Sequence, residues 1–249
     1  HRAETAQRTR VAHREHGNIV IDDLGTDASL AARATALPAS VSLSFLPYPQ
    51  AAPLLAHNAA VGGHEVLLHM PMQPEGAHNP GPMALTTGLA SDQIRTRLLG
   101  ALARIADASG INNHEGSRFT SDRNGLVPVV ETLADRHLFF LDSRTTPDTE
   151  VVKVSRAFGV ASAGRDVFLD DTPSAEAVAA QLAVAEARAR SEGVVIAIGH
   201  PHDSTLSVLA AWCAEAKKRG FDLIPASRAI RLKTERDILN PPQSLAQLR

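Results

Sequence analysis

Short apolar segments alternate with segments of helical periodicity along most of this chain of 249 residues. The apolar segments have the length of buried strands and are bounded by turn-forming or charged residues. We predict seven strands, over residues 18–22, 41–46, 65–70, 138–141, 167–169, 194–198 and 222–224. Strands that alternate with helices pair in parallel through right-handed crossovers, so the sequence predicts an α/β fold, either a barrel or an open sheet.

Helix boundaries follow from capping residues and apolar spacing. Ser91 begins a cap-like run, and apolar residues then recur at helical spacing up to Gly110. Thr172 and Pro173 open another helix, which Gly193 closes. The remaining helices are predicted over residues 27–35, 50–61, 125–136 and 204–219, and a long surface loop over residues 73–90.

Composition excludes several classes of protein. The 25 Lys and Arg residues against 27 Asp and Glu give a net charge of -2, which provides no basic field for nucleic acid. No apolar run is long enough to span a membrane. Cys213 is the single cysteine, which excludes an internal disulfide and a cysteine metal cluster, so metal chemistry here must use histidines and carboxylates. The sequence leaves the oligomeric state open.

Carboxylate or imidazole side chains stand at the end of nearly every predicted core strand. They are Asp22, Asp23, His69, His114, Asp142, Asp170, His200 and His202. The carboxyl ends of parallel strands meet at one rim, where ligands bind. Each residue alone has an ordinary structural interpretation, as a turn residue, a helix cap or a hydrogen-bonded histidine. Their recurrence at five elements favours a common site.

Carboxylates beside imidazoles, without thiols, suit a divalent ion such as zinc held by two histidines and one carboxylate. The same donor set accepts cobalt, manganese or iron. Such an ion lowers the pKa of bound water from about 15.7 towards 7, and a second carboxylate can take the proton of that water. The adjacent pair Asp22 and Asp23 can supply one metal ligand and one base.

The order of three motifs resembles the polysaccharide deacetylases with NodB homology. These motifs are Ile-Asp-Asp at residues 21–23, Gly-His-Glu-Val-Leu-Leu-His at 63–69 and Ile-Gly-His at 198–200. From Asn18 to Arg231 the chain looks like the divergent branch of that family, of which residues 112–117 and 70–72 are typical. The resemblance implies a distorted (β/α) barrel of about seven parallel strands and metal-dependent hydrolysis of N-acetyl or O-acetyl groups on sugars.

The resemblance also implies roles for individual residues. Asp22 would be the general base, and Asp23 and His69 would be metal ligands. The family has a second histidine four positions after the first, but Gln73 stands there in this chain. We therefore expect His114 to complete a set of Asp23, His69 and His114 around a divalent ion, with zinc the first choice.

Three further catalytic roles follow from the same resemblance. His200 would protonate the leaving amine or stabilise developing charge, and Asp142 would orient or tune a histidine. Arg118 is the first candidate for the arginine that holds the base, and Arg144 is the second. Aromatic residues that could grip a sugar are few, and Trp212 lies within a predicted helix.

We divide the chain into a polar N-terminal tail (residues 1–17), a single deacetylase-like catalytic domain (18–232) and a C-terminal tail (233–249). Because the chain begins at His1 and not at Met, we expect a processed or truncated protein, with which loss of a signal or anchor is compatible. The resemblance favours the periplasm or cell envelope, while a single cysteine is compatible with the cytoplasm too.

The sequence leaves two alternatives to an acetylated-glycan deacetylase. A catalytically degenerate barrel could act as an envelope glycan-binding or protein-binding module, because Gln73 replaces a histidine and sugar-stacking aromatics are scarce. A different metal-dependent hydrolase, such as an amidase or phosphoesterase, is the other, since activated water attacks more than one electrophile.

Overall fold

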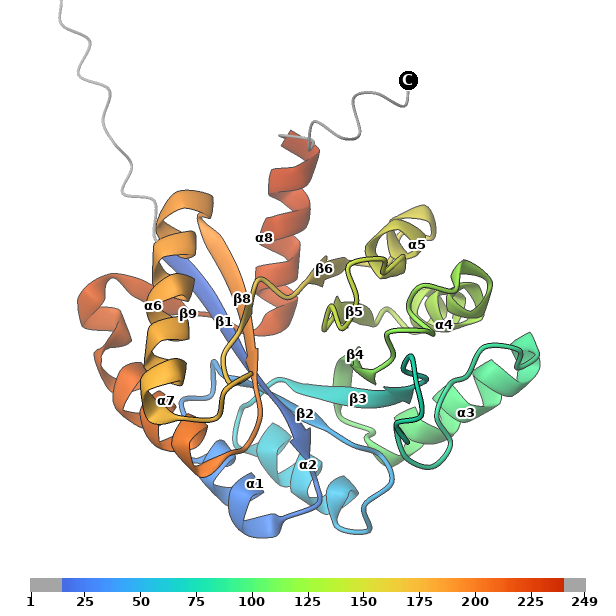
Figure 1. Cartoon of the computed structure of the whole chain (residues 1–249), viewed down its shortest axis with the longest axis horizontal. Coiled ribbons are helices and arrows are strands. Elements are labelled where there is room, and N and C mark those ends of the chain that lie inside the picture. The colour runs from blue at the N-terminus through green and yellow to red at the C-terminus, as the bar shows by residue number, and fades with distance from the viewer. Residues whose placement is uncertain (1–14, 240–249) are drawn as a thin grey trace, which may run out of the picture.

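The computed structural model describes residues 15–239, and within them nine parallel strands form one curled sheet (Figure 1). Eight strands follow the order β6-β5-β4-β3-β2-β1-β8-β7, and the ninth, β9, pairs with β1. The strands are β1 (Glu15–Leu24), β2 (Ser42–Phe45), β3 (Val66–Met72), β4 (Ala108–Glu115), β5 (Phe139–Asp142), β6 (Ser162–Gly164), β7 (Val167–Phe168), β8 (Val194–Gly199) and β9 (Phe221–Leu223). The predicted α/β fold and distorted barrel are confirmed, in the form of a half-barrel.

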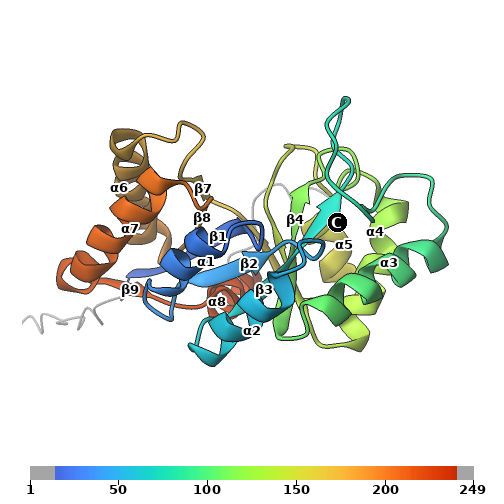
Figure 2. The same ribbon diagram turned by 90° about the horizontal axis from the view of Figure 1, so that it is seen from below.

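Helices connect the successive strands, and all except the last helix of the chain cover the outer face of the sheet, as Figure 2 shows from below. They are α1 (Ala28–Thr35), α2 (Ala52–Val61), α3 (Ser91–Arg104), α4 (Arg123–Asp135), α5 (Val151–Ala157), α6 (Ala175–Glu192), α7 (Asp203–Ala216) and α8 (Ala226–Leu239), with a 3-10 turn at Lys217–Arg219. In the part of the chain that the structure describes, no helix has both the length and the apolarity needed to cross a bilayer.

All seven predicted strands are present, but β4 and β6 were missed. Ile105 fits the apolar spacing of a helix that continues to Gly110, whereas α3 ends at Arg104. Ile105 is buried from the turn that follows, and β4 begins at Ala108. Gly110 lies within this strand, where glycine is needed because the Phe139 ring lies 2.5 Å from where a Cβ would be.

The predicted domain boundaries at both ends need correction, as far as the described residues reach. β1 begins at Glu15, and Gly17 pairs with Val195 of β8 and Leu223 of β9. Gly17 is required there because the Phe221 ring lies 2.0 Å from the place of a Cβ. At the other end α8 crosses the predicted boundary after residue 232. Residues 1–14 and 240–249 of the two predicted tails lie outside the described part.

Helix α8 occupies the concave side of the curled sheet, where it contacts β1, β8, β5 and β6 (Figure 1). Its residues Ala226, Ala229 and Ile230 pack with inward-facing strand residues such as Val20 and Ile196 in an inner core. The outer residues of the same strands pack under the surrounding helices in a second, larger core. The half-barrel is therefore filled by a helix at one end, which leaves its other end for a site.

Side chains of the strands cap the start of α8. The Ser42 hydroxyl accepts a hydrogen bond from the Ala226 N–H at 3.0 Å, and a Glu65 carboxylate oxygen accepts one from the Ser227 N–H at 2.8 Å. Asn18, fully buried, donates to the Ser42 hydroxyl and to the Ile224 carbonyl. The N–H groups in the first turn of a helix have no acceptor within that helix, so these contacts fix where α8 enters the barrel.

The substitution Ile230→Ala tests whether α8 is part of the folded core. Ile230 is fully buried. We expect the free energy of unfolding to fall by about 2–5 kcal/mol, measured by urea denaturation, because the change leaves a cavity. The exposed neighbour Arg231→Ala should change it by less than about 0.5 kcal/mol. Equal effects of the two substitutions would contradict the assignment of α8 to the core.

Candidate active site

The end of β1 brings two adjacent carboxylates to the same point. Asn18, Val20 and Asp22 alternate along the inward face of the strand, so Asp22 faces the barrel interior and is only 2% exposed. The next residue would face outward, but Asp23 adopts a left-handed backbone conformation with φ 56°. Aspartate tolerates this conformation better than most residues. The turn thereby directs the Asp23 carboxylate to the same rim.

Asp23 meets two histidines from neighbouring strands. Its Oδ1 atom lies 2.8 Å from His114 Nδ1 and 3.2 Å from His69 Nε2, and the two nitrogens are 3.2 Å apart. The three atoms come from the ends of β1, β3 and β4. The structure therefore brings together the three residues predicted as metal ligands.

The same three atoms satisfy a test of fit to a metal ion. Asp23 Oδ1 is buried and lacks a hydrogen-bond partner of suitable geometry, although two nitrogens lie close to it. Ligand atoms about 2.0–2.2 Å from a tetrahedral ion lie roughly 3.4 Å from each other, close to the separations found here. One carboxylate and two imidazoles are a donor set typical of zinc. The residues present therefore fit a divalent ion.

Asn112 fixes the orientation of His69 and of Asp22. His69 Nδ1 donates to Asn112 Oδ1 at 2.8 Å, so in the neutral ring the lone pair is on Nε2, the atom that faces Asp23. The Asn112 amide in turn donates to Asp22 Oδ1 at 2.7 Å, and its oxygen also accepts from the Ser44 hydroxyl at 2.5 Å. One Asp22 oxygen is thus held, while Oδ2 lies 3.8 Å from His69 Nε2.

His200 stands on the opposite side of Asp23, after β8. Its Nδ1 donates to Asp170 Oδ1 at 2.9 Å, and its Nε2 lies 3.9 Å from Asp23 Oδ2. The other Asp170 oxygen accepts hydrogen bonds from the His200 backbone N–H and the Thr205 hydroxyl. A buried carboxylate held by three donors keeps the ring in one tautomer, with Nε2 towards the site.

The expected role of Asp142 therefore belongs to Asp170. Asp142 accepts hydrogen bonds from the Arg144 backbone N–H and the Thr149 hydroxyl, and within residues 15–237 it has no hydrogen bond to a histidine. It stabilises the turn that follows β5. Asp170 has a visible signal, since it ends a predicted strand, but the sequence does not show which carboxylate faces His200.

The arginine near the base is also different from the first prediction. Arg118 is exposed and lies outside the cavity that contains Asp22, whereas Arg144, the second candidate, lines that cavity together with Arg165. Arg165 is the guanidinium that interacts electrostatically with Asp22. Arg165 was not predicted, because it lies between two very short strands, β6 and β7, and belongs to no recognisable motif.

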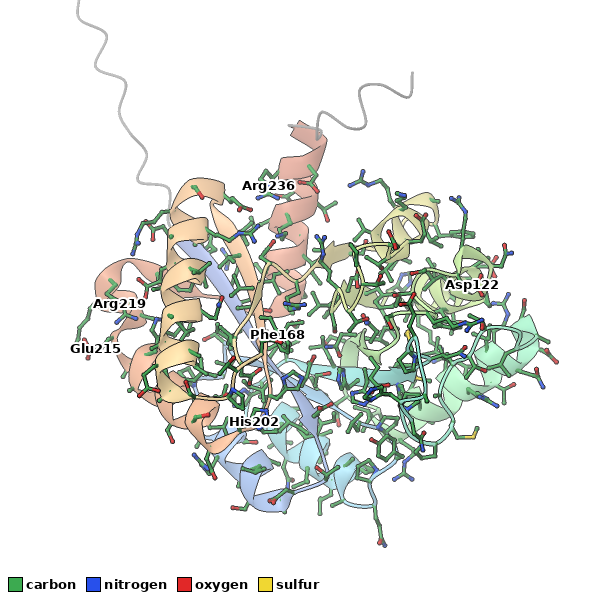
Figure 3. The ribbon with its side chains drawn as sticks, in the orientation of Figure 1. Asp122, Phe168, His202, Glu215, Arg219 and Arg236 are labelled. Atoms are coloured by element: carbon green, nitrogen blue, oxygen red, sulfur yellow. The ribbon has the colours of Figure 1, made fainter. Side chains whose placement is uncertain are left out.

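The cavity at this rim has a volume of about 480 Å³. Its lining includes the cluster just described together with Phe168, Ile198 and Glu115. Phe168, central in Figure 3 above His202, packs edge-on against the His200 ring at 5.5 Å. Glu115, also missed, has a buried Oε2 without a hydrogen-bond partner and a left-handed backbone at φ 51°.

The pKa values show that the site favours positive charge at its centre. Burial alone would lower the pKa of His69, but Asp22 and Asp23 outweigh it and raise this pKa to about 9. Burial would raise the pKa of Asp23, yet His114 and His69 bring it far below its usual range. Burial raises the pKa of Asp22, against the influence of His69 and His200. Asp22 is therefore a stronger base than an exposed carboxylate.

The fold and this rim define the chain as a NodB-like α/β protein. A model described as "Divergent polysaccharide deacetylase" matches residues 19–230, and the chain belongs to this family. Uncharacterized proteins of Haemophilus influenzae and of Escherichia coli K12 (YibQ) are each 37% identical, over 193 and 191 residues, respectively. The aligned regions cover 78% and 77% of this chain, but 69% and 60% of the two relatives.

Solved structures agree with the fold. An uncharacterized protein of Agrobacterium tumefaciens C58 superposes with a TM-score of 0.84 at 28% identity, covering 88% of this chain and 90% of that one. A family 4 carbohydrate esterase of Streptomyces lividans (TM-score 0.51, 83% and 90% covered) and a pseudoenzyme of that family from Bacillus anthracis (0.54, 87% and 66%) are each 14% identical. These two show the fold alone.

The substitution Asp23→Asn tests the ion site. We expect the affinity for Zn²⁺, measured by isothermal titration calorimetry, to fall by at least about a hundredfold, more than the loss of a residue that only supports a ligand costs. The control is Asp142→Asn, which removes a buried carboxylate at the same rim but outside the cluster, and which should change the affinity by less than about threefold. Equal losses in both variants would refute the assignment of Asp23.

The substitution Asp170→Asn tests the pair that orients His200. Despite burial, the contacts with His200 lower the pKa of Asp170, and Asp170 raises the pKa of His200 against the effect of burial. The lowered pKa of Asp170 stabilises the fold above about pH 4, and this contribution is lost as pH falls. The raised pKa of His200 stabilises the fold below about pH 6.5, and this contribution is lost as pH rises.

The stability difference between the wild type and Asp170→Asn should therefore be largest between about pH 4 and 6.5 and should shrink on either side. Urea denaturation of both proteins in EDTA from pH 3 to 9 measures it. A difference that stays constant over this range would contradict a charged Asp170–His200 pair.

Proposed function

We propose that this protein hydrolyses N-acetyl or O-acetyl groups of an envelope glycan with a divalent ion held by Asp23, His69 and His114. The observation that carries the proposal is the meeting of these three side chains beside a carboxylate and an independently held histidine. The ion, when bound, supplies Lewis-acid activation of water. Its identity is proposed as zinc from the donor set.

Asp22 is suited to the role of base. Asn112 holds one of its oxygens at 2.7 Å, so the carboxylate cannot rotate freely, and the other oxygen faces the cluster. Burial raises its pKa, which brings its basicity closer to that required near neutral pH. We assign to Asp22 the removal of a proton from the attacking water.

His200 is suited to the role of acid. Asp170 fixes Nδ1 and keeps Nε2 pointed at the site, on the side of Asp23 away from His114. Despite burial, Asp170 and Asp22 raise its pKa, so more of the imidazolium is present near neutral pH. We assign to His200 protonation of the leaving amine or alcohol, so that the proposed base and the proposed acid line one cavity.

A binding module without turnover is the second candidate. Gln73 stands where the family has a histidine, and its side chain accepts two hydrogen bonds from Thr87, so it belongs to the loop and not to the cluster. His114 supplies an imidazole in its place, which supports the enzyme over the binding module. Glycan binding without acetate release from any acetylated sugar would instead favour the second candidate.

The substitution Asp22→Asn tests the proposed reaction. We expect acetate release from acetylated oligosaccharides, measured with zinc, cobalt or manganese present, to fall by about 10²–10⁴-fold because the base is lost. Metal content, measured in the same samples, should stay within about twofold because Asp22 is not a ligand. Full activity at unchanged metal content would reject Asp22 as the base.

A further inference from the structure

Two arginines line the cavity that contains Asp22 and Asp23, namely Arg144 and Arg165. Within residues 15–237, neither guanidinium makes an ion pair with a carboxylate. Arg144 also lines the neighbouring cavity beside β6, where other cations are paired, Lys233 with Asp166 and Arg236 with Glu192. Asp22, Asp23 and Glu115 line the same cavity, and Asp22 acts on Arg165 without forming an ion pair with it. The two guanidinium groups repel each other, so a ligand anion that contacts both would stabilise them.

Arg165 is held by neutral groups. Its Nε donates to the Ser143 carbonyl at 2.7 Å, and a terminal nitrogen donates to the Arg144 carbonyl at 3.3 Å. The guanidinium carbon lies 4.7 Å from the centre of the Phe168 ring. These contacts fix the direction of the guanidinium without neutralising its charge. Burial lowers the pKa of Arg165, Asp22, Asp142 and Asp171 oppose this effect, and Arg144 adds to it.

Arg144 occupies a specific place as well. Its backbone is left-handed, with φ 52°, and its N–H donates to the buried Asp142 carboxylate at 2.8 Å. The Arg144 side chain crosses β6 at Gly164, where a Cβ would lie 2.7 Å from the Arg144 Cδ atom. A buried carboxylate and a glycine on two different strands therefore position this arginine at the cavity.

We propose that Arg144 and Arg165 bind an anionic group of the substrate, so that the glycan carries a carboxylate or a phosphate close to the acetyl group. The guanidinium group matches both anions in geometry and charge. The cavity of about 480 Å³ that holds both arginines also holds the proposed catalytic residues, so one sugar ligand reaches both. The presence of an acetyl group on the ligand rests on the proposed function, whereas the binding of its anionic group by the two arginines does not.

The test compares three sugars that share the N-acetylglucosamine ring. They are N-acetylglucosamine itself, its 6-phosphate, and N-acetylmuramic acid, which carries a carboxylate. NMR titration of the full chain, first in EDTA and then with zinc, measures dissociation constants apart from turnover. We expect one or both anionic sugars to bind at least about tenfold more tightly than the neutral sugar, and the preferred anion identifies carboxylate or phosphate.

Arg144→Gly removes the guanidinium and suits the left-handed backbone, and Arg144→Asn is a second variant that tolerates it. Both should abolish the preference for the anionic sugar while the neutral sugar binds within about twofold of the wild type. The control is Arg123→Ala, an exposed arginine at the start of α4 outside the cavity, which removes the same charge and should keep the preference. Thermal unfolding confirms that each variant is folded.

Three results would overturn the inference: equal affinity for neutral and anionic sugars, an anion preference that survives both Arg144 variants, or loss of the preference in Arg123→Ala. The first two would show that the arginines do not bind the anion, and the third that the effect is general surface charge. A preference that Arg144 controls, together with no acetate release from any sugar, would retain the anion site and reject the proposed hydrolysis.

Discussion

Asn112 connects the elements that the site is made of. Its single side chain is hydrogen-bonded to Ser44 of β2, His69 of β3 and Asp22 of β1, and it stands on β4 itself. The amide can serve them all because its oxygen accepts and its nitrogen donates. Buried polar groups are costly unless their partners are present, so this network specifies how four neighbouring strands align at their carboxyl ends.

At the opposite end of the half-barrel, a second set of buried polar side chains positions a helix. Asn18 and Ser42 there hold the start of α8, which fills the concave side that the sheet leaves open. Small and apolar residues of the helix then pack against the inward faces of the strands. A sheet that does not close on itself thus obtains an inner core from a helix, and the space above that core is the cavity.

The sequence predicts most residues of this rim because the ends of apolar strands can be recognised in it. Asp23 and His69 end apolar runs and His114 lies in the segment that follows the next helix, and parallel pairing brings the ends of such strands together. What the sequence could not show were interactions that depend on the turns between strands, namely the hydrogen bond between Asp170 and His200 and the electrostatic interaction of Arg165 with Asp22. β4 was missed because helical spacing continues past α3, and α8 was not predicted because it is rich in charged residues.

Gln73 belongs to the loop that follows β3 and not to the cluster. The oxygen of Asp23 and the nitrogens of His69 and His114 therefore come from three separate strands, and not from two histidines of one segment. Any cation held there acts as a crosslink across the sheet. It binds the native chain and not the unfolded one, so its occupancy adds to the free energy of unfolding. An ion bound by these few atoms would therefore couple the persistence of the fold to the supply of that ion.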